Sequence, residues 1–373
     1  MRMKRWVTSI FIVALLCSLL QGCDSKKKQA VLKINEAQDY IEDKEYKEYI
    51  ATIDEYLNSC KFQGSILIGK DDKIILAKGY GYADEVNKTW NTMNTTFEIG
   101  SITKQMTAVA ILQLQEEGKL SVEDSLTKYF PKFTKGENIT LSMLLRMRSG
   151  LYDHINDLYS FYPADVANQL VEMEYHHEDV ERDFVLEYIY LSDLKEIPDE
   201  KFSYCNTNYY LLGKIVEMVS QKSYEDYVKE KLFEPCNMTS TNTEFQGTVA
   251  KGYDAMGRYY SITKNIAFGC GDVNSNVIDM FKWNRALMKH TIMSEESFLE
   301  FTTTKAGYGC GVFADSLGIL HGGSTDVFNS FNIIYPEDNV TIVVLVNQPE
   351  DKLSSTVIAG NLRRFYQEQY SEH

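Results

Sequence analysis

The sequence predicts a mixed α/β (α+β) fold, in which strands from both ends of the chain form one sheet and a helical domain is inserted between them. Two observations lead to this prediction. Short apolar runs bounded by polar turns are typical of strands, and they occur near residues 64–77 and again near residues 317–346. The stretch between about residue 120 and residue 256 instead carries mainly helical periodicity and loops. Strands at both ends with helices between them therefore indicate a helical insertion in a sheet domain.

The N-terminal part of the sheet domain is expected to begin with an amphipathic helix. Over Glu45–Leu57, charged residues surround Tyr, Ile and Leu at helical spacing. Two apolar runs, Gly64–Gly69 and Ile74–Ala77, are separated by a polar turn and predict a β-hairpin. A mostly buried helix is then predicted over Ser101–Glu117, because Gly118 follows it and glycine is common just beyond a helix end.

The rest of the chain supplies the inserted helices and the return to the sheet. The clearest helices of the insertion are Asn208–Val219 and Tyr224–Leu232. A helix, three strands and a closing helix are then expected at Val277–Met288, Leu317–Leu320, Phe331–Tyr335, Val340–Val346 and about Ser355–Tyr366. We therefore expect an α/β sheet domain at residues 45–119 and 257–373 and a helical domain at residues 120–256.

Composition excludes several classes of protein. The chain has 373 residues, a formal net charge of −15, 44% hydrophobic residues and 24% charged residues. These proportions are ordinary for a folded globular protein, and the length fits about two domains. The acidic balance argues against a nucleic-acid partner, because neutralising phosphates requires clustered Lys and Arg.

The first 22 residues have the pattern of an export signal. A basic start precedes Trp6–Leu20, which is almost wholly apolar but too short and wrongly flanked for a membrane span. The run ends in Leu20-Gln21-Gly22-Cys23, which resembles the bacterial lipobox, where the Cys becomes lipid-modified and N-terminal. We expect a signal peptide at residues 1–22, a lipid on Cys23, a polar tether at residues 23–44 and a location on the extracytoplasmic face of the cell membrane. An ordinary secretory signal with a chance Cys is the alternative.

Cysteine and histidine patterns predict no metal site and no organic cofactor. No two cysteines form a CxxC pair, and the adjacent His176 and His177 lack the frame of a zinc-binding helix. The segment Gly64–Lys70 begins like a phosphate loop, but Asp71 stands where Ser or Thr would contact magnesium. Cysteines of the mature domain are expected to be buried structural thiols.

One short motif brings a hydroxyl close to an amine. Ser101-Ile102-Thr103-Lys104 is an SxxK motif at the predicted start of a buried helix, directly after Gly100. Residues three apart on a helix share a face, so Lys104 should lie one turn from Ser101. Burial and the helix N-terminus both disfavour positive charge, which favours a neutral Lys104 amine able to accept a proton. A Ser with such a neighbour is an activated nucleophile.

Two further motifs follow in order along the chain. Tyr204-Cys205-Asn206 is a YxN motif, and His321-Gly322-Gly323 is an HxG motif. With their flanks, the three motifs resemble the serine β-lactamase and penicillin-binding-protein-like family, in the branch of class C β-lactamases, D-stereospecific peptidases and related esterases. The resemblance covers about residues 61–366. The matching stretches are Phe97–Lys104, Leu144-Leu145, Ser149–Leu151, Phe202–Gly213, Phe233–Pro235, Asn237-Met238 and His321–Ser324.

The resemblance implies a β-lactamase/transpeptidase-like fold, with an antiparallel sheet flanked by helices and an inserted all-helical domain. It also implies catalytic roles for three side chains. Ser101 would be the nucleophile that forms an acyl-enzyme, and Lys104 would take or relay its proton. Tyr204 would act as general base and return the proton to the leaving group. A tyrosine pKa is ordinarily about 10, so a phenolate would need a strong cationic field, and the sequence leaves the protonation states open.

Four supporting residues follow from the same resemblance. Asn206 would hydrogen-bond Lys104 or the substrate amide, and the backbone N–H groups of Ser101 and Ser324 would form an oxyanion hole. His321 would lie on the strand that edges the site, where Gly323 allows close approach of the substrate. A histidine that is simply satisfied within its strand is the alternative for His321.

The resemblance implies a serine hydrolase acting through an acyl-enzyme on D-amino-acid peptides, cell-wall-derived peptides, amides or esters. In β-lactamases a Lys of the third motif helps to hold the substrate carboxylate, and a neutral His321 offers less charge there. We therefore expect weak or no β-lactamase activity. The alternative is a catalytically silent surface protein that binds peptidoglycan or a β-lactam.

Overall fold

The computed structural model describes residues 39–176, 178–244, 249–253, 259–260, 263–325, 327–348 and 354–370. The predicted signal peptide, Cys23 and most of the predicted tether lie outside the described residues, as does His177. None of the helices within these ranges is long and apolar enough to cross a membrane.

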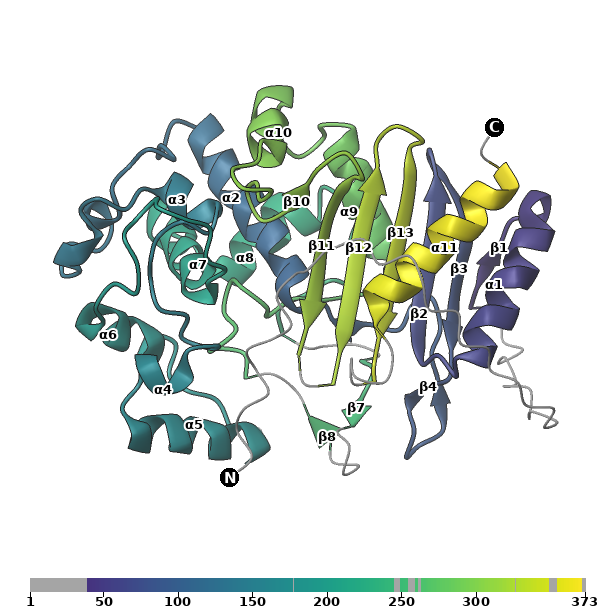
Figure 1. Cartoon of the computed structure of the whole chain (residues 1–373), viewed down its shortest axis with the longest axis horizontal. Coiled ribbons are helices and arrows are strands. Elements are labelled where there is room, and N and C mark those ends of the chain that lie inside the picture. Colours follow the sequence, from purple (N-terminus) through teal and green to yellow (C-terminus); the bar gives the residue numbers. More distant parts are fainter. Residues whose placement is uncertain are drawn as a thin grey trace.

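In the described chain, seven strands form one antiparallel sheet (Figure 1). Across the sheet they are β1 (Ile41–Glu42), β3 (Lys73–Tyr80), β2 (Gly64–Lys70), β13 (Val340–Val346), β12 (Asn329–Tyr335), β11 (Ile319–Ser324) and β10 (Phe313–Ala314). The N-terminal hairpin meets the C-terminal strands where β2 pairs with β13, from Gly64 opposite Val346 to Lys70 opposite Val340. The predicted sheet drawn from both ends of the chain is confirmed.

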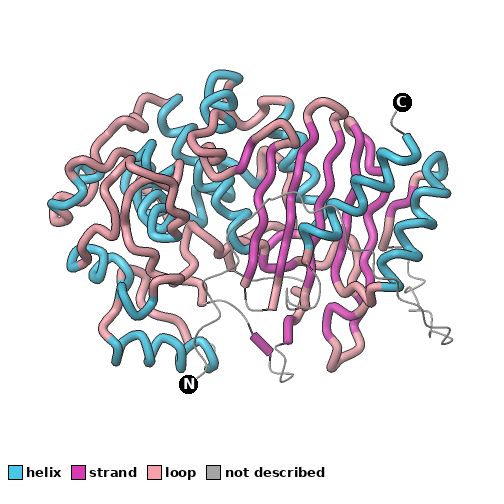
Figure 2. Tube along the Cα trace, in the orientation of Figure 1, coloured by secondary structure: helices cyan, strands magenta, loops and turns pink. Residues whose placement is uncertain are grey.

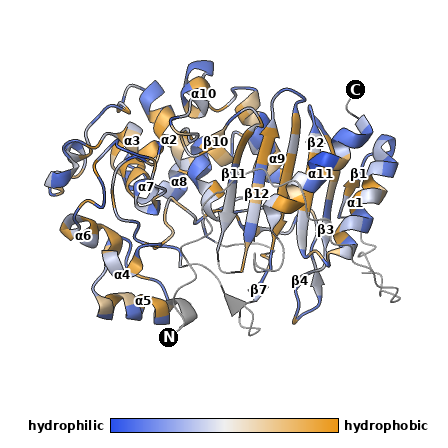
Figure 3. Cartoon of the chain, viewed as in Figure 1, coloured by the Kyte–Doolittle hydropathy of each residue, from blue (hydrophilic) through white to orange (hydrophobic). Residues whose placement is uncertain are grey.

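Alternating residues of the central strands pack into two separate apolar layers. Leu67 and Val343 belong to the larger core, whereas Ile66 and Val344 belong to a second layer. Successive side chains of a strand point to opposite faces, so each strand contributes to both layers. On the second layer lie α1 (Lys47–Ser59) and α11 (Ser355–Tyr370), and on the larger core lies α9 (Val277–Met288). Figure 3 shows apolar residues both on strands of the sheet and on the helices.

The remaining helices gather beside the sheet (Figure 2). In chain order they are α2 (Thr103–Glu116), α3 (Leu141–Leu145), α4 (Leu158–Phe161), α5 (Ala164–His176), α6 (Phe184–Leu191), α7 (Asn206–Ser220), α8 (Tyr224–Val228) and α10 (Glu295–Thr302). Shorter helical turns are η1 (Lys44–Tyr46), η2 (Gly100–Ile102), η3 (Leu126–Lys128), η4 (Thr134–Gly136) and η5 (Lys229–Phe233). Three two-stranded pairs are β4–β5 (Tyr82–Asp84, Thr89–Trp90), β6–β9 (Phe97–Glu98, Asn274–Ser275) and β7–β8 (Gly252–Tyr253, Tyr259–Tyr260). The last pair straddles the predicted boundary after residue 256, and the predicted division into domains stays a prediction.

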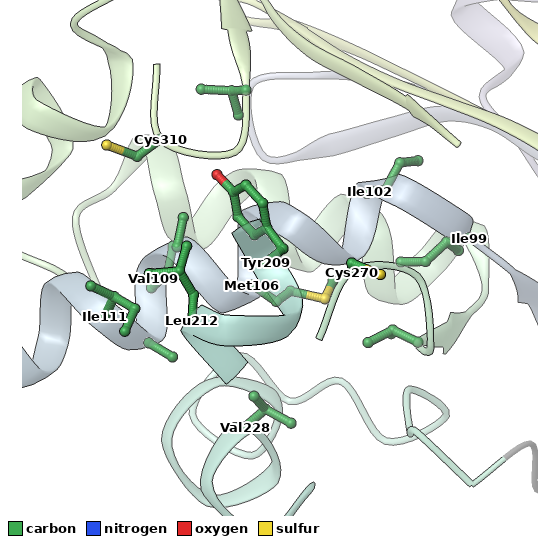
Figure 4. Packing of buried hydrophobic residues seen from close by; sticks show 14 of the residues in the cluster. Ile99, Ile102, Met106, Val109, Ile111, Tyr209, Leu212, Val228, Cys270 and Cys310 are labelled. Atoms are coloured by element: carbon green, nitrogen blue, oxygen red, sulfur yellow. The ribbon is translucent and has the colours of Figure 1, made fainter. Parts of the chain in front are cut away.

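Helix α2 is buried on nearly all sides, which fixes the first turn that carries Lys104. Its residues from Thr103 to Leu112 are all buried. Figure 4 shows Met106 and Val109 of α2 beside Tyr209 and Leu212 of α7. An element that packs all round has no freedom to rotate without opening voids in the core. Two differences from the predicted helices are local: Ser101 lies in the 3₁₀ turn η2, and the helix expected over Tyr224–Leu232 ends at Val228 and continues as the π-helical turn η5.

Candidate active site

The turn that presents Ser101 depends on the glycine before it. Gly100 has φ of +51°, in the left-handed region that favours glycine, and starts the 3₁₀ turn η2. Ile99, the residue before Gly100, is held by a hydrogen bond from its N–H to the carbonyl oxygen of Val273 at 3.1 Å. Ser101 itself is half-buried in this turn.

Lys104 is fully buried and directs its amine at Ser101. The Nζ atom lies 2.9 Å from Ser101 Oγ, 2.8 Å from Asn206 Oδ1 and 2.7 Å from the carbonyl oxygen of Cys270. The last two groups can only accept, so they occupy two N–H bonds of the amine. The third direction faces Ser101, whose hydroxyl can either donate or accept. A proton can therefore pass from Ser101 to Lys104 without movement of any heavy atom.

The ring of Tyr204, two residues before α7 begins, lies close to the same amine. Lys104 Nζ lies 5.1 Å from the centre of the Tyr204 ring and 5.8 Å from that of Tyr209. Burial raises the pKa of Tyr204 above 10, and the charge of Lys104 with hydrogen bonds to Lys104 and Ser101 only partly offsets this. The raised pKa favours the neutral phenol of Tyr204, which can donate a proton.

His321 is buried and electrically neutral. Its Nδ1 lies 2.6 Å from the carbonyl oxygen of Gly322, so Nδ1 carries the proton, and Nε2 lies 3.1 Å from the Tyr308 hydroxyl and accepts from it. Burial, together with the nearby charge of Lys104, lowers the pKa of His321 to about 3. The ring centre lies 6.2 Å from that of Tyr204 and 5.6 Å from that of Phe313. The residue expected to edge the site thus sits in an aromatic cluster with both nitrogens satisfied.

The end of β11 lies directly against the turn that carries Ser101. A Cβ at Gly323 would lie 2.0 Å from the carbonyl oxygen of Ile99 and 2.5 Å from Ser330 Oγ, and a Cβ at Gly100 would lie 3.1 Å from the Ser324 backbone nitrogen. Ser330 Oγ donates to Ile99 O at 2.8 Å and locks this contact. The backbone of Ser324 is therefore held beside that of Ser101, as an oxyanion hole would require.

Ser101, Tyr204 and Asn206 thus lie around Lys104, whereas Gly323 and Ser324 lie against the turn that carries Ser101 and the His321 ring lies beside that of Tyr204. The sequence did not indicate several neighbours of these residues. The Cys270 carbonyl, Tyr308 and Tyr209 were missed. The segment that carries Cys270 is placed by the two-residue pairing of β6 with β9, which is too short for any periodic pattern. No group of three or more His, Cys, Asp or Glu residues in the described ranges is arranged to hold a metal ion.

The cysteines near the site are packing residues. Cys205, Cys236, Cys270 and Cys310 are buried free thiols, and burial raises the pKa of the last three to about 12. Burial also raises the pKa of Cys205, so its thiolate is not accessible at neutral pH. Cys60 alone among the five described cysteines is half-exposed, which departs from the expectation that all would be buried.

We predict that Gly323→Ala lowers the rate at which a fluorophosphonate labels Ser101 by about 100-fold, because the new methyl group must push β11 away from Ile99 and with it the Ser324 N–H. Gly322→Ala is the matched control, since its Cβ would meet its nearest neighbour at 3.5 Å, an ordinary contact. Labelling of both variants at the wild-type rate would show that this contact does not shape the site.

A second prediction concerns acid stability. In the unfolded chain His321 becomes protonated near pH 6.5, whereas in the folded protein it stays neutral down to about pH 3. The folded state therefore loses stability as the pH falls between these two values. Between pH 7 and pH 4.5, the unfolding free energy of His321→Asn should therefore fall by about 2 kcal/mol less than that of wild type, as measured by urea denaturation. The same substitution at the exposed His290 is the control, and an unchanged pH slope in His321→Asn contradicts the prediction.

Comparisons with known proteins agree with this geometry. The chain matches the Beta-lactamase family over residues 50–362. It is 31% identical over 320 residues to PbpX of Bacillus subtilis (strain 168), by name a penicillin-binding protein, covering 81% of this chain and 76% of that one. It is 30% identical to Protein flp of Staphylococcus aureus (strain MRSA252) over 82% of this chain, but spans only 64% of that protein.

Two solved structures have the same fold. One is an octameric penicillin-binding protein homologue from Pyrococcus abyssi, with a TM-score of 0.70 and 29% identity over 87% of this chain and 77% of that one. The other is a D-amino acid amidase from Ochrobactrum anthropi SV3, with a TM-score of 0.73 and 20% identity over 88% of this chain and all of that one. The resemblance found in the sequence is confirmed: the chain belongs to the Beta-lactamase family, with the β-lactamase/transpeptidase-like fold.

Proposed function

We propose that this protein is a serine hydrolase that forms an acyl-enzyme at Ser101 with peptides, amides or esters of D-amino acids, including cell-wall-derived peptides. One observation carries the proposal: the hydroxyl of the half-buried Ser101 lies 2.9 Å from the buried Lys104 amine, which also contacts two oxygens that can only accept. The hydroxyl groups of Ser101 and Tyr204 are then the groups with which this amine can exchange a proton. Membership of the Beta-lactamase family supports a hydrolase of the serine type.

The proposed mechanism has two halves. Ser101 Oγ attacks the carbonyl carbon while neutral Lys104 takes its proton, and the backbone N–H groups of Ser101 and Ser324 stabilise the oxyanion. The phenol of Tyr204 donates its proton to the leaving group, and the Lys104 ammonium returns one to Tyr204. Water then attacks the acyl-enzyme by the same proton path in reverse, which releases the acid and restores Ser101.

The charge around His321 supports substrates other than β-lactams. A ring that stays neutral above about pH 3 offers no cation to a carboxylate placed against β11. We therefore propose weak or no β-lactam hydrolysis. The D-amino acid amidase has the same fold, so this architecture is compatible with amide substrates, and the penicillin-binding relatives are compatible with acylation by a β-lactam.

We predict that a fluorophosphonate or fluorescent-penicillin label attaches to the wild-type protein and is lost in Ser101→Ala. Ser125→Ala is the matched control, since Ser125 also begins an SxxK sequence but caps η3, where it accepts from the Thr127 N–H. Turnover is then profiled on D-amino-acid peptides, amides and esters beside nitrocefin. Labelling without turnover would favour a silent receptor for peptidoglycan or a β-lactam, and nitrocefin cleavage at rates typical of resistance enzymes contradicts the proposed specificity.

We further propose that Cys23 carries a lipid that holds the domain on the extracytoplasmic face of the membrane. The support is the lipobox-like Leu20–Cys23 and the apolar run before it. Cells that express the chain should incorporate labelled palmitate into it and retain it in the membrane fraction. Cys23→Ala should abolish both, whereas Cys60→Ala should change neither. Equal palmitate incorporation in the two variants rules out lipidation at Cys23.

A further inference from the structure

Asp153 is a buried carboxylate whose hydrogen bonds reach into the site. It lies in the loop that follows α3 and is 3% exposed. Its own turn supplies the N–H groups of Ile155 at 2.9 Å and Asn156 at 3.1 Å, and the Asn156 side chain at 2.7 Å. The remaining donors belong to Asn206: its backbone N–H at 3.1 Å and its Nδ2, which lies 3.0 Å and 3.2 Å from the two carboxylate oxygens.

These contacts decide which way the Asn206 amide faces. The two ends of an asparagine amide have similar shapes, and the neighbours determine which position the oxygen takes. A carboxylate can only accept, so Asp153 selects the NH₂ end, and Oδ1 turns to Lys104. The opposite orientation would bring two oxygens together at Asp153 and two sets of N–H bonds together at Lys104.

We propose that Asp153 is a positioning residue for the reaction at Ser101, acting through the Asn206 amide to keep the reactive direction of the Lys104 amine aimed at the serine. This inference rests on the proposed function and adds a fourth residue to the series of contacts that ends at Ser101. The links run from Asp153 to Asn206, from Asn206 to Lys104 and from Lys104 to Ser101. The carboxylate also places a negative charge one amide away from the amine.

A purely structural role would have different consequences. Cys205 offers no side-chain cap to α7, and Asp153 accepts from the Asn206 N–H at the first residue of that helix. A carboxylate there satisfies an end group and favours the helix dipole, so its loss would reduce stability. Capping alone, however, predicts no dependence on the side chain at position 206 and no change in the pH dependence of Ser101.

The decisive experiment exchanges the two side chains. Asp153→Asn, Asn206→Asp and the double variant are compared with wild type by the rate at which a fluorophosphonate labels Ser101. Each single variant should lose about 10- to 100-fold, because donors face donors in the first and carboxylates face each other in the second. The double variant should regain about tenfold over either single variant, since the new amide at position 153 can donate to the new carboxylate at position 206, which still accepts from Lys104. Losses that simply add overturn the inference.

The pH dependence of labelling separates positioning from capping. The charged and titratable groups placed around Lys104 are Asp153, His154, Tyr204, Tyr209, Cys270, Asp272 and His321. The proposed proton transfer to Lys104 takes place beside the Asp153 charge, so removing that charge in Asp153→Asn should shift the acid limb of the labelling rate. Asp157→Asn is the matched control: it removes a charge from the same loop, where Asp157 accepts from the Asp153 N–H and from Lys195. An acid limb that stays in place in Asp153→Asn counts against the inference.

Two further measurements give a clear result even where one variant does not fold. Asn206→Asp leaves the Asp153 turn intact, so wild-type labelling in that variant alone overturns the inference even where Asp153→Asn does not fold. The same cycle is measured as unfolding free energy, which requires no activity. Absence of labelling in wild type overturns the proposed function, whereas wild-type labelling with uncoupled variants overturns only the role of Asp153.

Discussion

The amine of Lys104 is the group on which the rest of the site depends. A buried amine is costly unless its hydrogen bonds are satisfied, and three separate segments each supply one partner: Ser101, Asn206 and the Cys270 carbonyl. Two of these partners can only accept, and Ser101 is the one of the three that can exchange a proton. The contacts that satisfy the buried amine are therefore the same ones on which the proposed reactivity of the serine depends. Movement of α7 or of the segment that carries Cys270 would first break a hydrogen bond to the Lys104 amine.

The surrounding architecture prevents such movement. Helix α2 carries the amine and is packed against α7 along its length, while β11 is in contact with the Ser101 turn through glycine. Elements packed this closely resist small displacements, because a shift opens voids or creates clashes. The sheet contributes indirectly: β12, the neighbour of β11, carries Ser330, whose hydroxyl bonds to Ile99 just before the turn. Strands far from the serine in sequence thus set the position of its backbone.

Much of this could be predicted from the sequence, and the omissions have physical reasons. Helix α9 and strand β13 were predicted at their exact bounds, and the hairpin strands β2 and β3 to within three residues, since apolar runs with clear stops specify them. The three motifs were found because each is a short contiguous stretch of sequence that can be recognised without any tertiary contact. The Cys270 carbonyl, Tyr308 and Asp153 were missed because each acts through a tertiary contact, and the strand pair β6–β9 that places Cys270 contributes only two residues per strand. The protonation of Tyr204 was undecidable from composition, because burial and the field of Lys104 act in opposite directions and only geometry shows which is larger.

The lack of charge on His321 bears on both substrate binding and proton transfer in the proposed site. In the β-lactamases that the third motif resembles, a lysine of this strand helps to hold the carboxylate of the substrate. Here the ring is tied to Tyr308 and the Gly322 carbonyl, and a second cation beside Lys104 would oppose the protonation of that amine during the reaction. In the proposed mechanism, this uncharged aromatic cluster would let Lys104 take a proton from Ser101 without a neighbouring cation. The His321 ring lies beside that of Tyr204, the proposed proton donor. The same lack of charge would weaken the binding of an anionic substrate, which is the basis of the proposed preference for substrates other than β-lactams.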